Sequence, residues 1–130
     1  MAYYAYASFS SSPGAYPWTA HAGVTPDNIE PAVERMLWVL RKVRQTKVSA
    51  NELKDTQGLM IGSLPLALET NDGRAGTLHH IEFYKLGEDY IERYPEMVRA
   101  ITADVLLEVA RKYVDTEGYA LVTVKPGDQS

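Results

Sequence analysis

The chain of 130 residues contains no cysteine, which excludes disulfides, thiolate metal sites and cysteine nucleophiles. This absence leaves the cellular compartment open, because cytosolic and exported proteins can both lack cysteine. No apolar run approaches the roughly 20 residues of a membrane-spanning helix, so we expect no membrane span. There is also no basic stripe interleaved with aromatic residues, and the formal net charge is -4, so we expect no nucleic-acid partner.

The composition that remains is typical of a folded protein and not of a disordered one. Hydrophobic residues make up 45% of the chain and charged residues 23%, which is enough apolar material for a modest core. A chain of this length suits one domain. We therefore expect a single α+β domain over residues 1–126, itself a fragment of a longer domain, followed by a frayed tail over residues 127–130.

Two strands are predicted at the start of the chain and one near its end. Residues 2–10 alternate with a period of two and are rich in aromatics, which favours a strand with Tyr3 and Tyr4 on opposite faces. A turn at residues 11–14 would join it to a second strand over residues 15–23, with Pro17 at an edge or at the start of pairing. Residues 119–124 predict a closing strand.

Helical spacing and capping residues predict four or five helices between these strands. The surest covers residues 26–45: it begins at Thr25-Pro26, and Pro31 predicts an irregular or later start. Ser49 to Glu52 form a capping box for a helix from residue 50 to about 61, and its extension toward residue 70 should be kinked or broken by Pro65.

The later helices are predicted from similar signals. Asn71 and Asp72 would cap a helix that runs to about Leu86 and ends at Gly87. A shorter helical stretch follows over residues 89–101. Thr102 would cap the last helix, whose expected buried stripe consists of Val105, Leu106, Val109, Ala110 and Tyr113.

The order of two strands, several helices and one strand favours an α+β fold with an antiparallel sheet and helices packed on one face. Three strands are few for so many helices. We therefore expect the sheet to be incomplete, with further strands supplied by another segment or chain. Its open edge should promote self-association.

The histidines do not form a recognised metal motif. His79 and His80 are adjacent and would point about 100° apart on a helix, so both cannot easily bind one ion. His79 and Glu82 could share a face, yet neither H-E-x-x-H nor H-x-x-E-H occurs in the chain. We expect no metal site in this chain, with His79 and His80 at a helix surface or helix contact and His21 structural.

Other candidate groups also have simple structural explanations. Residues 10–12 are three serines without the G-x-S-x-G pattern of a nucleophile, so we interpret them as a polar loop. The glycines at 58, 62, 73 and 76 form no phosphate-binding pattern. We interpret the acidic residues Glu88, Asp89, Glu92 and Glu96 as a solvated face, with a catalytic acid pair as the open alternative. The nine tyrosines favour aromatic packing on a sheet over direct chemistry.

Several segments, in order, resemble the later part of the insulinase-pitrilysin family of zinc metallopeptidases. Residues 48–53 (VSANEL) are similar to the start of that family's second helix in its C-terminal domain. The stretches LPLALETND at 64–72 and EFYKLGEDYI at 82–91 also resemble the family. So do ITADV at 101–105 and ARKYV at 110–114, which are similar to its closing helix. The resemblance covers nearly the whole chain, but no single segment is a catalytic signature.

This resemblance implies a half-lobe like that of mitochondrial processing peptidase, without the zinc site. Family members close two α+β halves around a peptide, and the zinc lies in the N-terminal half, which has no counterpart here. In the second half, a segment R-x-x-x-G-L-A-Y supplies an arginine and a tyrosine that reach the substrate. Residues 1–3 resemble its end, so Tyr3 matches the tyrosine, with Tyr4 as the alternative register. The arginine would precede Met1.

The resemblance therefore implies a substrate-clamping lobe whose partners are a peptide and a zinc-bearing N-terminal lobe or subunit. By itself this chain should hydrolyse nothing and bind no cofactor. One alternative is a non-catalytic scaffold or pseudo-peptidase subunit of the same family. Another is an unrelated α+β interaction module, which a parallel sheet, or a helix 26–45 that does not pack on the hairpin, would favour.

Overall fold

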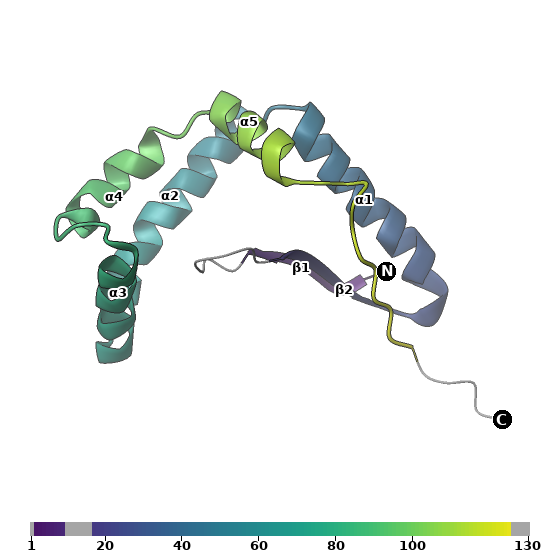
Figure 1. The fold of residues 1–130 in the computed structure, drawn as a ribbon, viewed down its shortest axis with the longest axis horizontal. Coiled ribbons are helices and arrows are strands. Elements are labelled where there is room, and N and C mark those ends of the chain that lie inside the picture. Colours follow the sequence, from purple (N-terminus) through teal and green to yellow (C-terminus); the bar gives the residue numbers. More distant parts are fainter. Residues whose placement is uncertain (1, 10–16, 126–130) are drawn as a thin grey trace. The chain divides into compact units, whose positions relative to one another are not determined.

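The computed structural model describes residues 2–9 and 17–125 and has the predicted α+β class (Figure 1). Its elements in chain order are β1 (Ala2–Phe9), β2 (Trp18–Val24), a short 3-10 helix η1 (Pro26–Asn28), α1 (Ile29–Gln45), α2 (Ala50–Ala67), α3 (Asn71–Tyr84), α4 (Tyr90–Arg99) and α5 (Ala103–Tyr113). None of the helices in the described part of the chain is long and apolar enough to cross a membrane.

The chain divides into two compact units, and the division falls inside α5. The first comprises residues 1–46 and 108–130, and the second comprises residues 47–107. The single domain over 1–126 stays a prediction, and the expected tail at 127–130 lies outside the described residues.

The first unit contains an antiparallel hairpin, as the alternation of residues 2–10 predicts. β1 pairs with β2 so that Ala5 lies opposite Ala22 and Phe9 lies opposite Trp18. Pro17 precedes β2 and takes no part in the ladder, which agrees with its missing N–H donor. The predicted turn at 11–14, the three serines at 10–12 and the start of the second predicted strand lie outside the described residues.

Helix α1 follows the hairpin and contacts β2. Its late start agrees with the irregularity expected from Pro31, because residues 26–28 form one turn of 3-10 helix first. Thr25 does not cap with its own side chain; instead its hydroxyl accepts a hydrogen bond from Asn28 Nδ2 at 2.6 Å. The half-buried face consists of Ile29, Val33, Met36, Leu37 and Leu40, whereas Val43 is exposed.

Helices α2, α3 and α4 belong to the second unit. Ser49 Oγ accepts from the Glu52 amide at 3.2 Å, so α2 begins where the capping box predicts. Pro65 does not break this helix, which continues to Ala67. Pro65 lies in the last turn, and the helix ends only two residues after it.

Two predicted boundaries of α3 are wrong. Thr70, and not Asn71 or Asp72, is the N-cap, since its hydroxyl accepts from the Gly73 amide at 3.0 Å. The helix ends at Tyr84, before the predicted Leu86. Lys85 then adopts a left-handed conformation with φ 54°, and the Leu86 amide donates to the Ile81 carbonyl at 3.0 Å. This is a Schellman end, with lysine at the position that usually holds glycine.

Helix α4 lies beside α2, as Figure 1 shows and their contacts confirm. Val98 on α4 is among the few apolar side chains that are buried, with 3% of its surface exposed. Gln57 on α2 donates through Nε2 to the carbonyls of Val98 at 2.9 Å and Ile101 at 3.0 Å. One side chain therefore links α2 to the last turn of α4 and to Ile101 just beyond it.

The last part of the chain differs from the sequence-based expectation. Thr102 does cap α5, because its hydroxyl accepts from the Val105 amide at 3.3 Å. Of the predicted buried stripe only Ala110 is buried. Residues 119–124 form no strand, and Val122 and Val124 are 85% and 91% exposed. Both errors have one cause: β-propensity and an amphipathic pattern indicate a need for a partner surface, but do not supply one.

Candidate functional site

Tyr3, the residue singled out by the family resemblance, lies at an irregularity of β1. Ala2 pairs with Val24 and Tyr4 pairs with Gly23, so Tyr3 is the extra residue of a β-bulge. Bulges re-aim side chains, and they are common beside active sites. The Tyr3 side chain is 77% exposed, so its hydroxyl is open to a bound molecule.

Tyr4, the alternative register, belongs to a row of rings on the hairpin. The Tyr4 and Tyr6 ring centroids are 6.0 Å apart, and Tyr6 stacks on His21 of β2 at 4.9 Å. The Tyr4 ring lies against Gly23, where an added Cβ would meet its Cε1 at 2.4 Å. Tyr4 is thus held by packing, whereas Tyr3 is not part of this row. His21 is the stacking partner of Tyr6 in this row, and its structural role stays a prediction.

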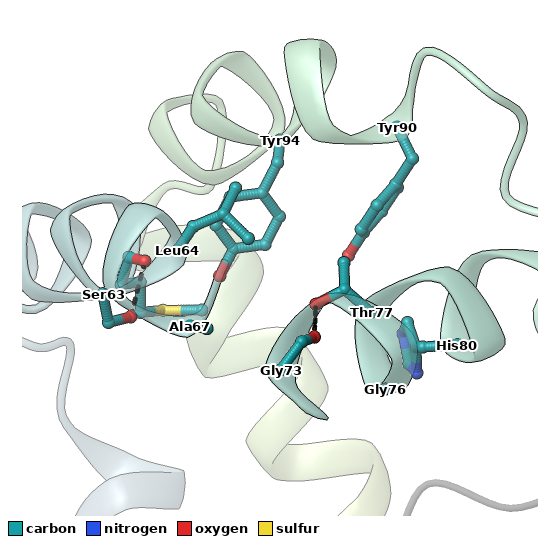
Figure 2. A pocket seen from close by; sticks show the side chains of 10 residues that line it. Ser63, Leu64, Ala67, Gly73, Gly76, Thr77, His80, Tyr90 and Tyr94 are labelled. Carbon is teal, nitrogen blue, oxygen red and sulfur yellow. Dashed lines mark hydrogen bonds between the residues drawn. The ribbon is translucent and has the colours of Figure 1, made fainter. Parts of the chain in front are cut away.

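A second candidate lies between α2, α3 and α4, entirely within the second unit (Figure 2). It is a hollow of about 390 Å³, open to solvent. Its lining consists of Met60, Ser63, Leu64, Ala67, Gly73, Gly76, Thr77, His80, Tyr90 and Tyr94. Tyr90 and Tyr94 point from α4 toward α3 and α2, as Figure 2 shows. No charged side chain is among these ten residues.

The two small hydroxyls of this hollow are already engaged with their own helices. Ser63 Oγ donates to the Met60 carbonyl at 2.9 Å, and Thr77 Oγ1 donates to the Gly73 carbonyl at 2.8 Å. Such back-bonding uses the single hydroxyl proton of each residue. Neither hydroxyl is therefore arranged as a nucleophile, because each donates its proton to a backbone carbonyl and not to a base.

The aromatic residues of the hollow form a connected cluster. His80 lies 4.7 Å from the Tyr84 ring and 6.3 Å from the Tyr90 ring, and Tyr90 meets Tyr94 edge-on at 5.8 Å. Burial raises the pKa of Tyr90, with a smaller contribution from Tyr94. The arrangement can hold an uncharged, partly apolar group.

Gly73 has a steric role here and not a phosphate-binding one. An added Cβ would lie 1.8 Å from the Ala67 carbonyl oxygen. Only glycine allows α3 to start so close to the end of α2. Gly58, Gly62 and Gly76 show no such close approach.

The histidine pair takes part in ring contacts on two sides of α3. His79 lies 5.6 Å from Phe83, while His80 faces Tyr84 and Tyr90. The prediction of a helix surface and a helix contact fits this placement. Among residues 2–9 and 17–125, no three His, Asp or Glu side chains come together as a group that could hold a metal ion.

The acidic residues near α4 include one specific ion pair. Asp89 Oδ2 accepts from Arg93 Nε at 2.7 Å, one turn later. This hydrogen bond lowers the pKa of Asp89. Glu88, Glu92 and Glu96 are exposed, in line with the interpretation of a solvated face.

Sequence reasoning missed the hollow. Ser63, Thr77, Tyr90 and Tyr94 come from three helices, and no spacing rule connects them. A usable signal did exist in the small residues Ser63, Ala67, Gly73 and Gly76, since small side chains on adjoining helices leave room for larger rings opposite.

No protein-family model matches this chain, and no curated protein matches it either.

Proposed function

We propose that this chain is the substrate-clamping C-terminal lobe of a two-lobed zinc metallopeptidase, in which a separate N-terminal lobe or subunit holds the zinc. The ordered family-like segments between residues 48 and 114 support the proposal, as does a sheet that is antiparallel and contacted by α1. The observation that carries it is the placement of Tyr3 at a bulge, with its side chain exposed.

In this proposal Tyr3 contributes through its hydroxyl. A phenol can donate a hydrogen bond to the peptide carbonyl as negative charge develops on its oxygen. Closure of this lobe over the peptide excludes water from the bond to be cleaved. The zinc of the other lobe supplies an activated water molecule. Strand β1 itself carries no Asp, Glu, Lys or Arg side chain.

The test combines this chain with an H-x-x-E-H lobe expressed beside it and follows hydrolysis of quenched fluorogenic peptides. We expect hydrolysis only with both lobes, and none with a chelator. Tyr3→Phe should lower kcat about 100-fold with little change in KM, because one hydrogen bond to the developing charge is lost. Tyr119→Phe, another exposed tyrosine of the first unit, is the matched control.

Two outcomes would count against this function. Hydrolysis by the chain alone would show that the chemistry lies here, and equal activity of the Tyr3→Phe variant would remove the role of Tyr3. If Tyr4→Phe and not Tyr3→Phe lowers kcat, the alternative register applies.

A non-catalytic scaffold of the same family is the second candidate, and a different observation favours it. Helix α5 exposes Val105, Leu106 and Val109, an apolar face suited to a partner protein. A scaffold should form a stable complex with the other lobe without hydrolysis. Tyr3→Phe should then leave complex formation unchanged, whereas Val109→Asp should weaken it.

A further inference from the structure

Strand β1 is exposed along its whole length, while β2 is half-buried. Every residue from Ala2 to Phe9 is exposed, and α1 contacts β2. In the described part of the chain, the sheet contains only these two strands. The outer edge of β1 therefore presents N–H and C=O groups that no described strand pairs.

The usual protections of an edge strand are missing from β1. Natural edges carry lysine, proline or other charges that block pairing with another strand. Residues 1–26 hold no Asp, Glu, Lys or Arg, and β1 holds no proline. The one protective device is the bulge at Tyr3. From Tyr4 onward the ladder is regular, so this stretch is open to a further strand.

Neutrality makes a second copy a suitable occupant of this edge. A charged strand that pairs with itself brings like charges together, which is destabilising, whereas an uncharged strand has no such cost. Consider two antiparallel copies related by a two-fold axis perpendicular to the sheet. Side chains that lie opposite each other across the two β1 strands must be on the same face of the sheet, and side chains alternate between faces along a strand. The axis therefore passes midway between the two copies of one residue, so that this residue lies opposite itself.

We propose that two copies of this chain pair β1 to β1 in antiparallel orientation, with Tyr6 of one copy opposite Tyr6 of the other across the two-fold axis. Tyr6 is one of the two central residues of the regular stretch from Tyr4 to Phe9, and pairing of Tyr4 to Ser8 about it leaves the bulge outside the new ladder. Ala5 would lie opposite Ala7 of the second copy, and Tyr4 opposite Ser8. The row of Tyr4, Tyr6 and His21 in each copy would join into one aromatic face on a four-stranded sheet.

This pairing does not depend on the proposed peptidase function. It requires neither zinc, peptide nor another lobe, and it is measured with this chain alone. A failure here leaves the Tyr3 experiment intact, and the reverse also holds.

A charge-swap experiment tests the axis residue. Sedimentation equilibrium should show a dimer for the unchanged chain. Tyr6→Lys and Tyr6→Glu should each raise the dimer Kd at least about tenfold, because identical charges meet on the axis. An equal mixture of the two variants should form the dimer again, since opposite charges now face each other. Tyr119→Lys and Tyr119→Glu, which lie outside β1 in the sequence, should show neither effect.

Cysteine variants test the register independently, and they remain informative if the Tyr6 variants do not fold. The chain has no cysteine of its own, so an introduced pair reports without background. A mixture of Ala5→Cys and Ala7→Cys should form the mixed disulfide in preference to either symmetrical one, because directly opposite Cβ atoms approach disulfide distance. Ala22→Cys on β2 is the control and should not cross-link.

A monomer or an open-ended aggregate of the unchanged chain would overturn the proposal. So would a dimer that persists equally in both single Tyr6 variants, which would place the interface elsewhere. Preferential cross-linking of Ala22→Cys would also overturn it.

Discussion

At the scale of single residues, Gln57 shows how one side chain can hold two helices together. Its Nε2 lies 2.9 Å from the Val98 carbonyl, 3.4 Å from that of Arg99 and 3.0 Å from that of Ile101. Val98 and Arg99 belong to the last turn of α4 and Ile101 follows it, and the Val98 carbonyl also accepts from the Ile101 amide at 3.2 Å. Gln57 thus links α2 to α4 by hydrogen bonds within the second unit.

Gln57→Ala should therefore lower the free energy of unfolding by about 1–3 kcal/mol, because partly buried carbonyls lose a donor. Urea unfolding followed by circular dichroism measures this. Lys54→Ala, an exposed substitution on the same helix, is the control and should change it by less than about 0.5 kcal/mol. Equal losses for the two variants would show that this link contributes nothing specific.

At the scale of elements, two residues with positive φ follow the end of α3, and they differ in how well they tolerate a left-handed backbone. Lys85 has φ 54° and Gly87 has φ 92°. A side chain is unfavourable in the left-handed region, while glycine is not. A Cβ on Gly87 would in addition lie 2.9 Å from Asp89 Oδ1.

Substitutions at these two positions should therefore have opposite signs. Lys85→Gly should raise the free energy of unfolding by about 0.5–1 kcal/mol, despite the loss of its exposed ion pair with Glu82. Gly87→Ala should lower it by about 1 kcal/mol or more. Thermal unfolding of both variants in one buffer is sufficient. Destabilisation by Lys85→Gly would mean that the lysine side chain makes a larger contribution than its backbone strain costs.

The elements also show what the sequence could predict and what it could not. Local signals worked: the alternation in β1, the caps at Ser49 and Thr102 and the apolar spacing of α1 act over a few neighbouring residues. The prediction of a strand at residues 119–124 was wrong because a strand needs a partner, and β-propensity does not say whether one is present. The sequence could not predict the candidate hollow for a similar reason, since Tyr90, Tyr94 and Ser63 come together only through tertiary packing.

At the scale of the whole molecule, the placement of the histidines predicts how the stability and the activity of this chain respond to added zinc. His79 and His80 contact different rings, and in the described part of the chain no group of three possible metal ligands forms. Stoichiometric zinc added to this chain alone should therefore change neither its Tm nor its hydrolysis of fluorogenic peptides. Differential scanning fluorimetry with and without chelator checks this. A clear rise in Tm at one zinc per chain would contradict our interpretation of the histidines.

The charge-free start of the chain also determines which proteases can report on it. Trypsin cleaves after lysine or arginine, and the first such residue is Arg35, beyond the hairpin. Chymotrypsin, by contrast, meets several tyrosines in β1 itself. Digestion by trypsin should thus release β1 and β2 on one peptide whatever their state. The rate of chymotryptic cleavage at those tyrosines instead measures how often the hairpin opens, residue by residue.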